Sequence, residues 1–228
     1  MSHYPIEPIV QAMKANADPE KAAAMSKYMR GQFPFFGIPQ PKRKELFRSH
    51  IRTYGKPASA DVLLAAVEVL WAYEERELAY VAMELLEGGL KLLELSHIHR
   101  IERCILTKSW WDTVDGLASH TVGGVMSRYS DDCRHYAGRW IGSDQMWLNR
   151  TALLFQLKYK GKTDRELLAA AIAAHVESKE FFIQKAIGWA LREYAKTDPG
   201  WVAHYVEQHE LMPLSRREAV KGLMLEGV

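Results

Sequence analysis

Hydrophobic residues recur at spacings of three and four along most of the chain, a pattern typical of helices with one buried face. In the segment from Glu74 to Leu86 the recurring positions are Leu78, Val81, Ala82, Leu85 and Leu86. The segments from Met146 to Lys158 and from Phe181 to Ala195 repeat the pattern. Sustained two-residue alternation between hairpin turns, which marks antiparallel strands, is missing. The sequence therefore predicts an all-α protein.

Comparable helix starts recur about every 35 residues, which is the length of two antiparallel helices with short connections. They fall near Glu75, Ser109, Gln145, Glu180 and Ser215. Stacked helix pairs form a curved solenoid whose concave face is an extended binding surface. No linker or low-complexity tract interrupts the chain. We therefore expect a single domain over residues 1–228, built as a divergent solenoid of HEAT-like helix pairs.

The composition narrows the class of protein. With 48% hydrophobic and 25% charged residues it is that of a soluble globular chain, and no apolar run approaches the roughly 20 residues that span a bilayer. The first residues carry no secretory signal. Cys104 and Cys133, the only cysteines, form no CxxC pair, which argues against a zinc site or disulfide framework and fits a reducing compartment. We expect a cytoplasmic monomer with no membrane partner.

The formal net charge of +2 leaves nucleic-acid binding open, because the placement of the basic residues matters more than their sum. In the predicted helix from Phe181 to Ala195, Lys185, Trp189 and Arg192 fall on one stripe. Basic and aromatic groups interleaved in this way suit a phosphate-and-sugar ligand. The alternative is a partly buried Trp189 beneath the lysine and arginine stems. Gly188 indicates close approach by a neighbouring helix or a ligand.

Two aromatic and two acidic residues lie close together between residues 108 and 115. Of these, Trp111 and Asp115 are four residues apart and share one face of a helix. An indole face attracts a cation, and a carboxylate stabilises positive charge or holds a water. The pair therefore suits a cationic, sugar-like transition state. The alternative places Trp110 in the core and Asp115 in solvent.

Further basic residues are candidates for phosphate contacts. Arg150, early in its own helix, offers planar bidentate recognition. Lys42, Arg43 and Lys44 follow Pro41 at a predicted helix start, where free amides favour a phosphate, although a solvated helix face is the alternative.

Signatures of other chemistries are missing. The nine histidines show no metal-ligand spacing, and the chain has no glycine-rich phosphate loop and no GxSxG. We expect neither a metal nor a nucleotide cofactor.

Three segments resemble the bacterial DNA alkylation repair family, in particular the AlkD-type DNA glycosylases built from HEAT-like repeats. They are residues 107–115 (TKSWWDTVD), 155–160 (FQLKYK) and 179–196 (KEFFIQKAIGWALREYAK). The resemblance extends from Tyr28 to Ala219, nearly the whole chain. It implies a base excision repair enzyme of the bacterial cytosol that acts on nucleoid DNA. Its reaction would be hydrolysis of the N-glycosidic bond of cationic N3- and N7-alkylated purines in duplex DNA, without strand cleavage and without base flipping.

The resemblance also implies site residues. Trp111, Trp189 and Asp115 match the residues that surround the deoxyribose of the lesion, and Arg150 matches an arginine at the DNA backbone. Tyr28 matches a tyrosine that approaches the DNA.

One loop departs from the family pattern. Where relatives have Gln-Thr-Pro, this chain has Pro39-Gln40-Pro41, so the contact of that glutamine is lost or passes to Gln40. We place Arg43, Lys185 and Arg192 among the DNA-binding residues as well.

The chemistry agrees with these residues. Alkylation makes the base a cationic leaving group that needs no general acid, and the sugar acquires oxocarbenium character as the bond breaks. Trp111 and Trp189 would stabilise that sugar by cation–π attraction of about 1 kcal/mol each. Asp115 would stabilise the cation and position the attacking water.

Two other functions fit an all-helical scaffold. One is a non-catalytic binder of DNA structures, and the other is a protein-interaction scaffold, which predicts an apolar concave groove. The joint presence of Trp111, Asp115, Arg150 and Trp189 favours the glycosylase.

Overall fold

The computed structural model describes residues 3–224, apart from the side chains of residues 130, 131 and 224. The described residues form helices, turns and loops without a strand, which confirms the all-α prediction. The chain divides into two compact units, one up to Glu94 and one from Leu95 onward. The single domain over residues 1–228 stays a prediction. No helix within residues 3–224 has the length and apolar character needed to cross a membrane.

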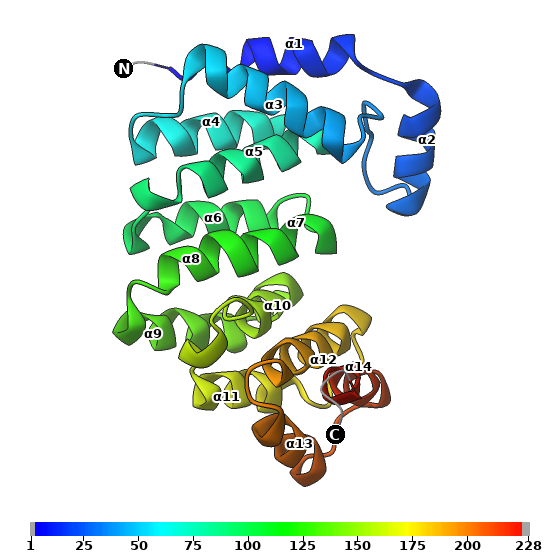
Figure 1. Cartoon of the computed structure of the whole chain (residues 1–228), viewed down its shortest axis with the longest axis vertical. Coiled ribbons are helices and arrows are strands. Elements are labelled where there is room, and N and C mark those ends of the chain that lie inside the picture. The colour runs from blue at the N-terminus through cyan, green and yellow to red at the C-terminus, as the bar shows by residue number, and fades with distance from the viewer. Residues whose placement is uncertain (1–2, 225–228) are drawn as a thin grey trace. The chain divides into compact units, whose positions relative to one another are not determined.

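The first unit is built around the antiparallel pair α4 and α5 (Figure 1). Its helices are α1 (Glu7–Ala15), α2 (Pro19–Tyr28), α3 (Gln40–Tyr54), α4 (Ala60–Ala72) and α5 (Arg76–Gly88), followed by η1 (Leu90–Leu92). Leu70 of α4 and Leu78 of α5 are fully buried, because the apolar faces of the two helices meet. Helix α3 packs on α1 and α5, whereas α2 buries none of its residues.

The second unit stacks its helix pairs in chain order from α6 to α14 (Figure 1). Its elements are η2 (Leu95–His97), α6 (Ile98–Leu106), α7 (Trp111–Gly116), the π-helical η3 (Leu117–Val122), α8 (Gly123–Met126), α9 (Ser130–Ile141), α10 (Met146–Leu154), η4 (Lys160–Lys162), α11 (Arg165–His175), α12 (Phe181–Ala195), α13 (Pro199–Gln208) and α14 (Pro213–Met224). A shared core runs through α10 to α13 and includes the buried residues Leu154, Ile172, Leu191 and Val202.

The predicted repeat is present in the helix starts. Helices α5, α7, α10 and α12 begin at residues 76, 111, 146 and 181, at intervals of 35, and α14 begins at 213. The residues that precede α7, α10 and α12 have extended backbone, so each of these helices has a well-defined first residue. Helix α12 has the predicted bounds, but α10 ends at Leu154, short of Lys158. Beyond its end, the side chain of Gln156 donates to the backbone oxygen of Asp164 and accepts from its backbone N–H, which ties this turn to the start of α11.

Candidate active site

Asp115 and Arg150 form a bidentate ion pair between α7 and α10. The Arg150 Nε donates to Asp115 Oδ1 at 2.6 Å, and Nη2 donates to Oδ2 at 2.8 Å. The side chains are 14% exposed for Asp115 and 5% exposed for Arg150. Two parallel charge-assisted hydrogen bonds fix both the position and the plane of the carboxylate. Asp115 is therefore not a solvated helix residue.

Arg150 also reaches a third helix. Its Nη1 donates to the backbone oxygen of Phe182, in the first turn of α12. A guanidinium carries five N–H donors, and these three bonds use one donor on each nitrogen. Arg150 thus joins α7, α10 and α12, and its contact with the DNA backbone stays a prediction.

Burial raises the pKa of the Asp115 carboxyl above its ordinary value, while the hydrogen bonds and charge of Arg150 oppose that shift. Asp112, on the same helix, adds a smaller upward contribution. The bidentate geometry requires the ionised carboxylate. Asp115 is thus a fixed negative charge that is more basic than an exposed aspartate.

The two tryptophans lie on either side of this ion pair in the chain. Trp111 is the first residue of α7 and lies one turn before Asp115, on the same face, with part of its surface exposed. Trp189 lies two turns after Phe182 on α12, about 10 Å along the helix axis. It is half-buried and packs against the core of the second unit, so the partial burial foreseen as its alternative is present. Its contact with a lesion stays a prediction.

An aromatic cluster supports the helix starts beside Arg150. The Trp110 ring lies 5.1 Å from that of Phe182 and 6.1 Å from that of Trp147. The Arg150 guanidinium lies 5.9 Å from the Phe182 ring. The rings bring the first turns of α7, α10 and α12 together, and Trp110 is partly buried among them.

Lys185 and Arg192 share one buried partner that the sequence did not identify. The carboxylate of Glu218, on α14, lies 3.1 Å from Lys185 Nζ and accepts a hydrogen bond from Arg192 Nη1 at 3.0 Å. A hydrogen bond from Lys221, together with the charge of Lys185, lowers the pKa of Glu218 to about 2. Both predicted cations stay partly exposed, so they remain available to a ligand.

The predicted DNA-binding residues of the first unit differ in exposure. Tyr28, at the end of α2, is 71% exposed, and Gln40 is exposed at the start of α3. Arg43 is buried, with its Nη2 3.1 Å from Glu84 Oε1 and its guanidinium 4.6 Å from the centre of the Tyr80 ring. The sequence placed Arg43 at the DNA, but its partners on α5 commit it to the interior.

Glu77 is a further residue that the sequence pattern did not reveal. Its buried carboxylate accepts hydrogen bonds from the backbone amides of Phe36, Gly37 and Ile38, at 2.9–3.0 Å. Gly37 has a φ of +86°, and a Cβ there would lie 2.0 Å from the backbone oxygen of Asp18. Glu77 therefore fixes the loop that leads into Gln40.

Comparisons with known proteins agree with the resemblance seen in the sequence. The chain matches the sequence model of a family described as DNA alkylation repair enzyme over residues 9–223. A solved structure of a predicted DNA alkylation repair enzyme from Enterococcus faecalis is similar, with 35% sequence identity and a TM-score of 0.83 over 90% of this chain and 95% of that chain. No match was found among curated proteins. This chain therefore belongs to the DNA alkylation repair enzyme family.

Proposed function

We propose that this chain is a monofunctional DNA glycosylase that hydrolyses the N-glycosidic bond of cationic N3- and N7-alkylated purines in duplex DNA, without base flipping. The observation that carries the proposal is the buried pair of Asp115 and Arg150, one helical turn from the partly exposed Trp111. A carboxylate that is fixed and largely desolvated interacts more strongly with a developing positive charge than a solvated one.

In this mechanism the bond between the base and C1′ breaks heterolytically. Its electron pair neutralises the alkylated base, and positive charge develops on the deoxyribose. Asp115 stabilises that charge and accepts a hydrogen bond from a water molecule. The water oxygen then bonds to C1′, and its proton passes to Asp115 or to solvent. The raised pKa of Asp115 suits this task, because it makes the carboxylate a better proton acceptor.

The remaining residues bind and orient the DNA. Trp111 and Trp189 pack on the lesion deoxyribose and stabilise the cationic sugar by about 1 kcal/mol each. Arg150 holds Asp115 and directs its remaining N–H donors toward the DNA backbone. Tyr28 and Gln40, both exposed, contact the DNA from the first unit.

Release of free base from a duplex that contains N7-methylguanine tests the proposal. We expect release by the native chain, with an intact abasic strand until alkali is added. Asp115→Asn should abolish release, whereas Asp112→Asn, the same change on the same helix, should largely retain it. Full activity of Asp115→Asn would remove the catalytic assignment. Salt-sensitive DNA binding without release by the native chain would indicate a DNA-structure binder instead.

A further inference from the structure

The buried carboxylate of Glu218 forms ion pairs with three basic side chains. Its Oε1 lies 2.7 Å from Lys221 Nζ and 3.1 Å from Lys185 Nζ, and its Oε2 lies 3.0 Å from Arg192 Nη1. The Glu218 side chain is 6% exposed, whereas those of Lys185, Arg192 and Lys221 are 38%, 33% and 50% exposed. The anion therefore lies beneath a surface of cations, and the cluster carries a net charge of +2.

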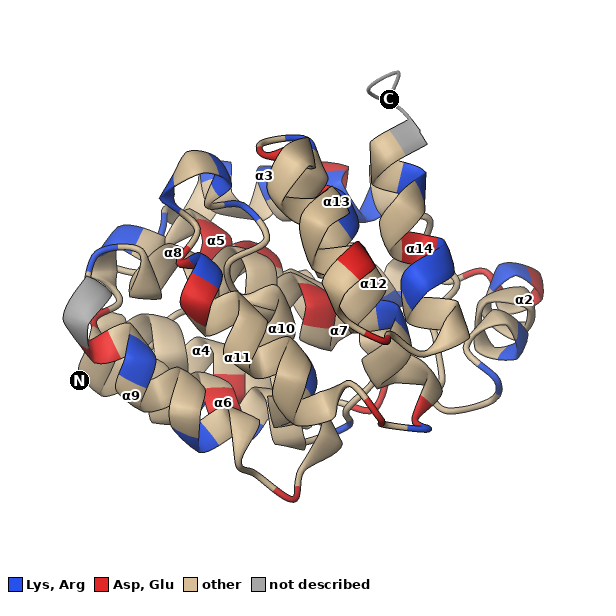
Figure 2. Cartoon of the chain, turned by 90° about the horizontal axis from the view of Figure 1, so that it is seen from below, with Lys and Arg blue, Asp and Glu red and all other residues tan. Residues whose placement is uncertain are grey.

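Close packing of α12 on α14 holds Glu218 in that position. A Cβ added at Gly188 would lie 2.8 Å from the backbone oxygen of Ser215, and one at Gly222 would lie 2.7 Å from the backbone oxygen of Arg192. The hydroxyl of Ser215 donates to the backbone oxygen of Gln184 at 3.0 Å. The helix approach predicted at Gly188 is thus made by α14, and Figure 2 shows the basic and acidic positions that α14 presents.

The cluster lies on the same stripe of α12 as Trp189. Lys185 precedes Trp189 by one turn, and Arg192 follows it by about one turn, so the two basic positions lie on either side of Trp189 along one face of the helix. Long basic side chains normally lose rotamer freedom when they bind a phosphate. Here Glu218 orders them before a ligand arrives.

We propose that Glu218 is a positioning residue that arranges Lys185, Arg192 and Lys221 as one site for backbone phosphates of the DNA strand that passes Trp189. The identity of the partner rests on the proposed function. The site extends the DNA-binding surface to α14 and adds Lys221, which no sequence pattern singled out.

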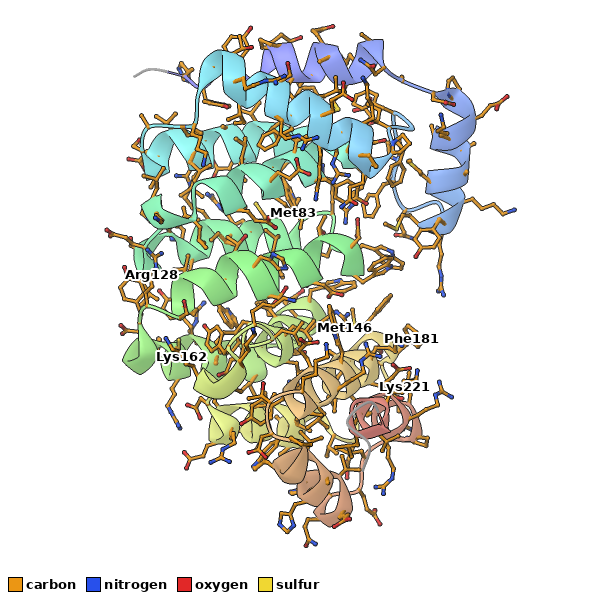
Figure 3. All side chains as sticks on the ribbon, in the orientation of Figure 1. Met83, Arg128, Met146, Lys162, Phe181 and Lys221 are labelled. Atoms are coloured by element: carbon orange, nitrogen blue, oxygen red, sulfur yellow. The ribbon has the colours of Figure 1, made fainter. Side chains whose placement is uncertain are left out.

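The salt dependence of DNA binding tests the role of Lys221. A contact between a lysine and a phosphate adds about 0.9 to the slope of log affinity against log salt concentration. We expect Lys221→Gln to lower the slope by about that amount on an undamaged duplex. As salt rises from 50 to 200 mM, the affinity of the native chain should therefore fall about 3.5 times more than that of Lys221→Gln. Lys162→Gln is the matched control, because Lys162 is also exposed and lies on the opposite side of the second unit from Lys221 in Figure 3. Equal slopes for the two variants would overturn the proposal.

Glu218→Gln separates positioning from net charge. The substitution preserves shape and raises the charge of the cluster from +2 to +3, so electrostatics alone predicts tighter binding and a steeper salt slope. Positioning predicts several-fold weaker binding, because the three cations lose their common anchor. Tighter binding would overturn the positioning role. Thermal unfolding is measured alongside, and if Glu218→Gln does not fold, Lys221→Gln against Lys162→Gln still decides the phosphate site.

The two proposals fail in different assays. Both tests of the phosphate site use binding to undamaged duplex, so they do not depend on catalysis. Absence of base release by the native chain would remove the glycosylase but leave the binding results to decide the site.

Discussion

Replacement of Arg150 by methionine tests the ion pair at the centre of the site. Methionine keeps much of the length of the arginine stem but removes the guanidinium. Asp115 would lose both hydrogen bonds that hold its carboxylate, and the backbone oxygen of Phe182 would lose its donor. The variant therefore leaves a largely buried carboxylate without a cation.

The expected loss of stability follows from the burial of the ion pair. Removal of one partner from a buried ion pair destabilises a protein by about 3–5 kcal/mol. The Asp115 side chain is 14% exposed, so water replaces part of the lost interaction. We therefore expect a loss at the lower end of that range, about 3 kcal/mol. The double variant Arg150→Met with Asp115→Asn should lose less than the sum of the single variants, because the buried charge is gone.

Urea unfolding followed by tryptophan fluorescence measures this loss, since six of the seven tryptophans belong to the second unit. Arg134→Met in the same unit is the control. Arg134 pairs with Asp164 at 2.7 Å, but its side chain is 55% exposed, so water screens this pair and we expect a much smaller loss of stability than for Arg150→Met. If Arg150→Met were as stable as Arg134→Met, the pair would not organise the site.

Three further predictions concern charge and packing. Base release should fall as the pH drops through the raised pKa of Asp115, because only the ionised carboxylate stabilises the sugar cation; a pH–rate profile whose acid limb lies at the ordinary aspartate value would contradict this. Gly188→Ala should destabilise the chain by about 1–3 kcal/mol, because the new methyl would lie 2.8 Å from the Ser215 oxygen. Thermal unfolding measures this loss, and Gly138→Ala, with no atom within 4 Å of its methyl, should be neutral or stabilising in that assay. Equal changes in stability for the two variants would argue against the close α12–α14 contact. Glu77→Gln should cost about 2–3 kcal/mol, measured by circular dichroism, since an amide cannot accept from all three backbone N–H groups. The same change at the exposed Glu45 should leave stability nearly unchanged, and a loss as large as that of Glu77→Gln would show that the effect is not specific to the loop.

The sequence predicted those features that depend on neighbours along the chain. Helix starts recur at a fixed interval because each helix pair repeats one pattern of apolar positions, and α12 was predicted from Phe181 to Ala195 as found. The shared face of Trp111 and Asp115 follows from helix geometry alone.

The partners of charged residues were not predictable, because they come from other repeats. Arg150 is 35 residues from Asp115, and Glu218 is 33 residues from Lys185. Helical spacing says which residues share a face, but side-chain packing decides which faces meet. The same limit applies to Arg43, whose burial depends on Glu84 and Tyr80 of α5.

The central claim is that Asp115 acts in the chemical step and not in binding. Single-turnover release of N7-methylguanine from duplex DNA, with protein in excess and every site occupied, measures that step directly. We predict that Asp115→Asn binds the duplex as the native chain does but releases base at the uncatalysed rate, while Asp112→Asn releases it nearly as fast as the native chain. A rate for Asp115→Asn equal to that of the native chain would contradict the account.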